Sequence, residues 1–210
     1  MRTPALVLAF LLALPGCALL GKSDPLVPRY FAPDEGSAGA PATPRTELRL
    51  KLGRVVGWSH LRERMALRTA THEYVFREDR RWTERPEVYL RRALVRTLFE
   101  ERGLVEVHSG RALTLEVELI AFEEVEKPHQ ARLVVRLALR DDRVCLLEET
   151  LTVLEPVAKS DPAGQAREVV EALTVALLSG VGQLADRVVA KLVELEPGRA
   201  PGGAPAADSR

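Results

Sequence analysis

The sequence predicts a single α/β domain of the α+β kind: a mostly antiparallel, twisted sheet of about five or six strands with two main helices packed on it. Two observations favour this fold. Apolar residues alternate with polar ones in several segments, as in half-buried strands, and switch to a helical spacing in two others. The order is strands, helix, strands, long helix. One sheet with both helices on one face is the simplest way to bury both apolar stripes.

The composition narrows the class of protein. The 210 residues carry 30 basic and 30 acidic side chains, so there is no overall positive charge of the kind that binds nucleic acid. Aromatic residues make up only 5% of the chain, so the core must be built mainly from Leu, Val and Ala. Of the two cysteines, Cys145 stands between two apolar residues, and we expect it to be a small buried hydrophobic residue.

The first residues have the layout of a bacterial secretion signal. A basic residue precedes an apolar run over residues 5–14, which is too short to span a bilayer because spanning needs roughly 20 apolar residues. The run leads into Leu14-Pro15-Gly16-Cys17, which resembles a lipobox. We expect residues 1–16 to be a signal peptide and Cys17 to be lipidated, with covalent diacylglycerol and an N-acyl chain. The alternatives are a secreted protein cut near Gly16 and an uncleaved anchor.

The residue after this cysteine is Ala18 rather than aspartate. By resemblance to enterobacterial sorting rules this favours the outer membrane, with the chain facing the periplasm, over the inner membrane. Residues 17–46 are expected to be the lipidated N-terminus and a tether, because proline, glycine and serine gather there. Within it the apolar segment 26–31 is expected to dock on the domain as an extended edge segment.

The domain is expected to span residues 47–195, and its first half to hold three strands. Residues 48–52 alternate strictly between apolar and basic side chains, which predicts a half-buried strand. Shorter strands are expected over 64–68 and 73–77. Trp82 follows them and precedes a proline-started helix, so we expect its ring to cover the end of the sheet and to be mostly buried.

A helix is expected to start at Pro86, because proline suits the first helical turn, and to stop at Gly103. Its leucines fall on one face. On the far side lie the candidate partner-binding residues, Arg85, Arg92 and Arg96. These arginines could meet an acidic partner or lipid phosphates, and the plain alternative is a solvated helix face.

The second half is expected to hold a short strand or link over 104–107 and then three long strands. Residues 113–121, 131–139 and 144–153 alternate as in an antiparallel meander with one wet face. Cross-strand ion pairs are expected on that face. The residues concerned are Glu116, Glu118, Arg132, Arg136 and Arg140.

A long helix is expected to follow and to run to Leu195. Asp161-Pro162 provides an N-cap and a first helical residue. Gly180 and Gly182 fall inside this helix, where glycine costs about 1 kcal/mol against alanine. They indicate a bend or a close approach to the sheet. Residues 196–210 are rich in proline, glycine and alanine and are expected to be a disordered tail.

No constellation of residues indicates catalysis, so we do not expect an enzyme. The four histidines stand at no metal-ligand spacing, and the sequence has neither a Gly-x-Ser-x-Gly elbow nor a Walker loop. We expect no metal and no cofactor besides the acyl groups on Cys17. Glu123, Glu124 and Glu126 cluster beside a turn and are expected to form a solvated strand end, with a cation site as the alternative.

Several of these segments together resemble one family. The stretches that carry the likeness are Cys17–Gly21 with Arg29–Phe31, His72–Arg77 leading to Arg81-Trp82, the helix from Pro86, Leu115–Glu123 and the final helix. In their order and spacing the chain resembles the ABC-type transport auxiliary lipoproteins, which include the PqiC-like subunits of envelope lipid-transport systems. The likeness covers most of 17–195. The proline-rich segment 33–44 and the tail depart from it as additions of this chain.

The resemblance implies a compact α/β fold and a non-catalytic role beside an ABC transporter permease and ATPase and an MCE-domain protein, in a system that moves lipid between membranes and supports envelope integrity. Self-association into a homo-oligomer is left open. Two other functions remain: a stand-alone lipid-binding lipoprotein with its own cavity, and an envelope-assembly or peptidoglycan-associated lipoprotein.

Overall fold

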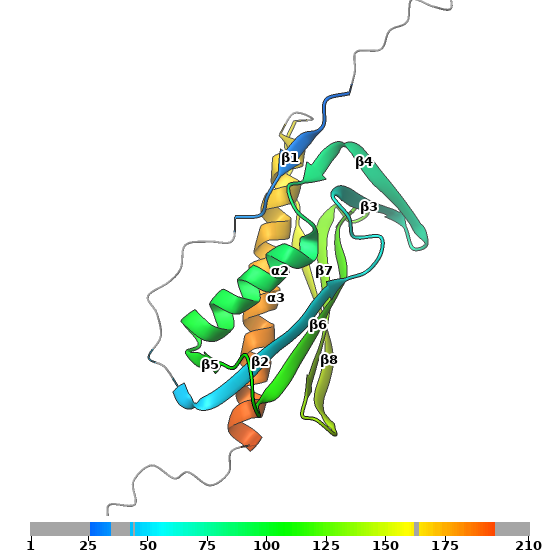
Figure 1. Ribbon diagram of the computed structural model, residues 1–210. Helices are drawn as coiled ribbons and strands as arrows, with labels where there is room; N and C mark the ends of the chain where they lie inside the picture. Colours follow the sequence, from blue (N-terminus) through cyan, green and yellow to red (C-terminus); the bar gives the residue numbers. More distant parts are fainter. Residues whose placement is uncertain (1–25, 35–42, 44, 162–163, 196–210) are drawn as a thin grey trace, which may run out of the picture.

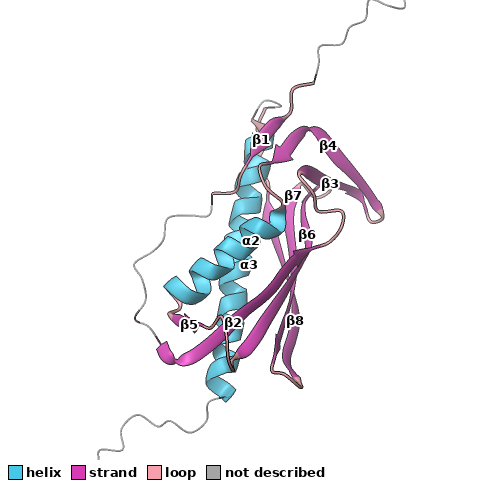
Figure 2. Cartoon of the chain, in the orientation of Figure 1, coloured by secondary structure: helices cyan, strands magenta, loops and turns pink. Residues whose placement is uncertain are grey.

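The computed structural model describes residues 26–34, 43, 45–161 and 164–195. The signal peptide, Cys17, the tail 196–210 and most of the expected tether lie outside these residues. The described part forms one eight-stranded sheet with helices on one face (Figures 1 and 2). Its elements are β1 (Arg29–Phe31), β2 (Arg45–Gly57), β3 (Arg64–Ala70), β4 (Glu73–Trp82), α2 (Pro86–Val95) continued by a π-helical stretch (Arg96–Glu101), β5 (Leu104–Glu106), β6 (Leu113–Val125), β7 (Gln130–Arg140), β8 (Cys145–Pro156) and α3 (Gln165–Leu195).

The long strand β6 is the axis of the sheet. One of its edges pairs with β7, and the other is shared by β2 in its first half and β3 in its second. Beyond them lie β5 next to β2, β4 next to β3, β1 next to β4, and β8 next to β7. The sheet therefore splits into two arms on one side of β6.

The sheet has eight strands, not the expected five or six, and it is mixed rather than mostly antiparallel. The pairs β1–β4, β2–β5, β2–β6 and β3–β6 are parallel, whereas β3–β4, β6–β7 and β7–β8 are antiparallel. Alternation of apolar and polar residues reports that one face is buried, but not the direction of the neighbouring strand. The segment between β2 and β6 contains a helix, and such a long crossover lets two strands run in the same direction.

The meander β6–β7–β8 and its wet face are confirmed. Glu118 pairs with Arg136 at 2.5 Å, and Glu116 pairs with Arg140 at 3.3 Å. Cys145, by contrast, is exposed rather than buried. It is the first residue of β8 and lies across from Arg140, the last residue of β7. Cys145 is therefore at the solvated end of this strand pair.

Both helices cover the same face of the sheet (Figure 2). The side chain of Asp161 accepts the backbone N–H of Gly164 at 2.7 Å, as expected of an N-cap. By length and composition α3 is apolar enough to cross a membrane, yet more than half of its apolar window is buried inside the domain. Its leucines, valines and alanines pack against β6, β7 and β8, so the protein core accounts for its hydropathy.

At the end of β4 the expected burial of Trp82 is confirmed, since its side chain is 1% exposed. The indole ring packs on Phe122 of β6 and on the edge of Tyr89 of α2, at centroid distances of 5.1 and 6.1 Å. The Tyr89 hydroxyl accepts the backbone N–H of Glu84 at 2.8 Å. These contacts join the entry of α2 to the sheet. The expected docking of segment 26–31 is confirmed in part: Arg29–Phe31 pairs with the edge of β4, whereas Leu26 and Val27 are exposed.

Candidate functional site

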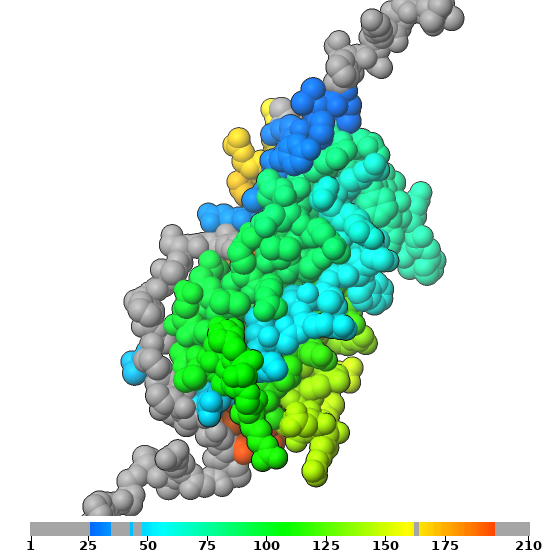
Figure 3. All heavy atoms as spheres, in the orientation of Figure 1, coloured from blue at the N-terminus to red at the C-terminus, as the bar shows by residue number. Residues whose placement is uncertain are grey.

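Two of the candidate arginines lie on the outer surface of α2. Arg85 and Arg92 have side chains that are 46% and 45% exposed. Each is already paired within the chain, Arg85 with Glu87 at 2.8 Å and Arg92 with Glu84 at 2.6 Å. In the space-filling view, α2 (green) lies at the surface between β1 (blue) and β2 (cyan) (Figure 3). This face is charged and accessible to a partner, but its positive charge is partly neutralised.

The third candidate, Arg96, does not continue this surface. Its side chain is only 14% exposed and lies 3.3 Å from Glu101. The backbone N–H of Arg96 still bonds to the carbonyl oxygens of Arg92 and Ala93, so Arg96 keeps its helical place in line with Arg92. Its side chain instead lies against Glu101, at the far end of the π-helical stretch Arg96–Glu101. The helix then ends near Gly103 as expected, where the glycine adopts a φ of 68°.

Two members of the acidic cluster near the end of β6, Glu123 and Glu124, form a buried charge network, which corrects the expected solvated strand end; only Glu126 is exposed as expected. Glu123 is 0% exposed, and its Oε1 accepts hydrogen bonds from Arg68 Nε at 2.7 Å and Arg132 Nη1 at 2.8 Å. His60 lies near this pair, and burial lowers its pKa below the usual value. A buried carboxylate needs such partners, because an unpaired buried charge is strongly destabilising.

The next residue, Glu124, points to the opposite face of the strand, as consecutive strand residues do. It is also buried and lies 3.0 Å from His129 Nε2, 3.6 Å from Arg77 and 3.9 Å from Arg80. The two glutamates therefore fasten β3, β4 and β7 to β6 from both faces. No group of three or more metal-ligating side chains occurs among the described residues, and the surrounding arginines give the cluster a structural rather than a cation-binding character.

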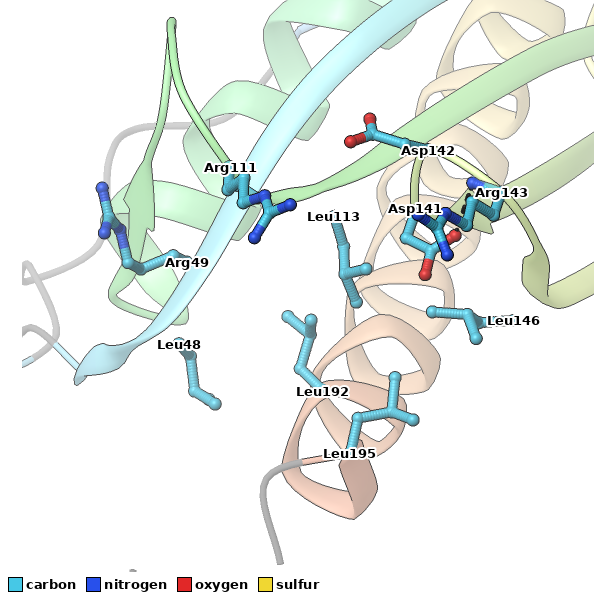
Figure 4. Close-up of a pocket in the computed structure, with 11 residues that line it drawn as sticks. Leu48, Arg49, Arg111, Leu113, Asp141, Asp142, Arg143, Leu146, Leu192 and Leu195 are labelled. Carbon is cyan, nitrogen blue, oxygen red and sulfur yellow. Dashed lines mark hydrogen bonds between the residues drawn. The ribbon is translucent and has the colours of Figure 1, made fainter.

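An open pocket of about 760 Å³ lies at the end of the domain where α3 finishes (Figure 4). This volume is within the usual range of small-molecule sites. Leucines from β2, β6, the start of β8 and α3 line it, and charged residues stand around them. The lining leucines are Leu48, Leu113, Leu146, Leu192 and Leu195, and the charged residues are Arg49, Arg111, Asp141, Asp142 and Arg143. We call this the α3-end pocket.

The arginines of this pocket differ from those of α2. Within the described residues, the guanidinium groups of Arg49, Arg111 and Arg143 make no hydrogen bond or ion pair, although Arg143 lies within electrostatic range of Asp141. Oδ1 of Asp141 accepts the backbone N–H groups of Arg143 and Val144 at 2.7 Å, and these bonds lower the pKa of its carboxyl group. No local pattern in the sequence predicts this pocket, because its residues come from four distant segments.

Residues 32–189 match the family described as the ABC-type transport auxiliary lipoprotein component. The chain belongs to this family. The resemblance found in the sequence is thereby confirmed, and membership identifies the protein as an envelope lipoprotein associated with ABC-type transport.

Solved structures share the fold. A protein from Xanthomonas campestris, with 18% sequence identity, matches with a TM-score of 0.68 over 81% of this chain and 100% of its own. An uncharacterized protein, with 16% identity, matches with a TM-score of 0.59 over 76% of this chain and 97% of its own. A search of curated proteins gave no significant match. The solved structures bear on the fold alone.

Proposed function

We propose that this family member is a non-catalytic periplasmic lipoprotein, anchored in the outer membrane through Cys17, that serves as an auxiliary docking subunit of an MCE-associated ABC-type lipid-transport system. The observation that carries the proposal is the family match over 32–189. The Leu14-Pro15-Gly16-Cys17 motif supports the anchor, and Ala18 supports the outer membrane. In such a system the ATPase is a separate chain.

The arrangement of the domain is compatible with a docking subunit. β1, the described element nearest in sequence to Cys17, lies at one end of the domain, and the α3-end pocket lies at the other (Figure 1). α3 has 31 residues and therefore spans about 46 Å, at 1.5 Å per residue. A domain of this length would extend from the membrane into the periplasm and offer the surface of α2 between the two ends.

A genetic experiment tests this function in the cell. Strains lacking this chain, the MCE-domain protein or both are compared for leakage of a periplasmic enzyme and for sensitivity to detergent. If the proteins act in one system, the double mutant is no more sensitive than the more affected single mutant. An additive defect would place the chain in a different process and contradict the proposal.

A further inference from the structure

The α3-end pocket has an apolar floor that the domain leaves partly open. Leu48 and Leu192 are buried, with exposures of 3% and 5%, but Leu195 is 38% exposed, and Leu113 and Leu146 are half-buried. Figure 4 shows side chains from the sheet and from the last turn of α3 facing the same space. An apolar surface gathered in a concave site favours an apolar ligand.

The rim of the pocket carries charge of both signs. Arg111 and Arg143 stand on opposite sides of Leu113 (Figure 4), and Arg49 is also part of the lining. With Asp141 and Asp142 the rim has three positive and two negative groups. Guanidinium groups that make no hydrogen bond to the described residues are suited to phosphate, which they bind through charge-assisted hydrogen bonds. The carboxylates suit an ammonium group next to that phosphate.

The two chain segments that adjoin the pocket-lining elements offer no large apolar residue to fill this pocket. Residues 35–44, which precede β2, and residues 196–210, which follow Leu195, contain no leucine, isoleucine, valine, methionine or aromatic residue. The described residues just before β1, 26–28, lie at the opposite end of the domain (Figure 1). These segments therefore supply no long apolar occupant, which points to another molecule.

We propose that the α3-end pocket binds an acyl chain of a phosphate-bearing lipid. The chain lies against Leu113, Leu146 and Leu195, and the phosphate lies between Arg111 and Arg143. This inference rests on the proposed function, because lipid is the cargo of such a transport system. A subunit with this pocket would contact the cargo itself. It assigns that contact to the end of the domain away from the lipid anchor.

Binding is tested on the purified Cys17→Ser chain, which carries no lipid of its own. Short-chain lysophosphatidate and lysophosphatidylethanolamine, both below their micelle concentrations, are titrated by calorimetry. The matched probes are glycerol phosphate, which lacks the acyl chain, and a monoacylglycerol, which lacks the phosphate. We expect saturable binding of the two lysolipids, weaker binding of the monoacylglycerol, and none of glycerol phosphate.

Two pairs of variants locate the site. Leu195→Glu should weaken lysolipid binding by roughly tenfold or more, while Val193→Glu, on the same turn of α3 and 54% exposed, should change it less than about twofold. Arg111→Gln with Arg143→Gln should weaken lysophosphatidate by roughly tenfold and the monoacylglycerol little. The control for charge is Arg54→Gln, an exposed arginine outside the pocket.

Several outcomes would overturn the inference. They are the absence of saturable binding, equal losses for Leu195→Glu and Val193→Glu, and an arginine variant that binds all lipids normally. Binding that appears only in a chain ending at Leu195 would assign the pocket to the tail, and a dimer abolished by Leu195→Glu would assign it to a second copy. The assay contains no transporter, so its failure is distinct from failure of the proposed docking function.

Discussion

Gly180 of α3 faces Leu133 of β7 so closely that a Cβ atom on the glycine would fall 2.4 Å from Leu133 Cδ2. Leu133 is fully buried and is the cross-strand partner of the buried Phe122 of β6, so it has little room to move. Glycine at this position therefore sets the distance between the long helix and the sheet. At Gly182, two residues later, an added Cβ atom would meet only open space.

The two glycines should respond to substitution in opposite ways. Gly180→Val should lower the free energy of unfolding by about 1–3 kcal/mol, because overpacking displaces Leu133. Gly182→Ala should raise it by up to about 1 kcal/mol, because alanine favours the helix. Chemical denaturation measures both. A Gly180→Val chain as stable as wild type would show that the close approach does not constrain the packing.

The buried carboxylate of Glu123 gives a second prediction. Glu123→Gln leaves Arg68 and Arg132 side by side without their counter-charge, and should cost about 3–5 kcal/mol in unfolding free energy. The control is Glu118→Gln, which breaks an exposed pair on the same strand and should cost about 0–1 kcal/mol. Similar losses for the two variants would mean that the ion pairs of Glu123 do not stabilise the contact of β3 and β7 with β6.

Much of the fold could be predicted from the sequence, because burial leaves a periodic pattern. Alternation located β2, β6, β7 and β8, and the helical spacing after Pro86 located α2. Strand direction and the arms of the sheet leave no such pattern, since they depend on contacts between distant segments. For this reason the sequence predicted a mostly antiparallel sheet where β2 and β3 both run parallel to β6.

The candidate site was harder to predict, and particular residues show why. Arg96 has the helical position that the spacing predicts, but its side chain lies against Glu101 and is only 14% exposed, which residue spacing does not reveal. Glu123 and Glu124 looked like a solvated acidic run, since their arginine partners lie on other strands. The α3-end pocket had no local signal at all, because folding alone brings Leu113 and Leu195 together.

Cys17 carries the proposed anchor. Cys17→Ser removes the thiol that would receive diacylglycerol, so the protein should move from the membrane to the soluble periplasmic fraction or remain unprocessed, and should lose palmitate labelling. Multiple acyl chains anchor a protein firmly, whereas a single chain is marginal. Membrane fractionation measures the change, and separation of the two membranes by density assigns the wild type. Unchanged fractionation and labelling would contradict lipidation at Cys17.

The outer surface of α2 is the proposed docking face, and only two of the three candidate arginines belong to it. Arg85→Gln with Arg92→Gln should leave the free energy of unfolding within about 0–2 kcal/mol of wild type, because exposed ion pairs contribute little. Recovery of the transporter with the chain should fall, most clearly at low salt, where charge attraction is least screened. Arg54→Gln with Arg167→Gln removes the same charge elsewhere and should not change recovery. Equal recovery for both double variants would make the α2 arginines an ordinary solvated face.

The central claim, that the chain is a subunit of a lipid-transport complex, is tested most directly by copurification. The full chain with a C-terminal tag is recovered from solubilised membranes, and its companions are quantified by mass spectrometry against an unrelated tagged outer-membrane lipoprotein. We predict that an MCE-domain protein and the permease of an ABC transporter are enriched with this chain and not with the control. If neither is enriched, at low or at moderate ionic strength, the chain does not act as a docking subunit of such a complex.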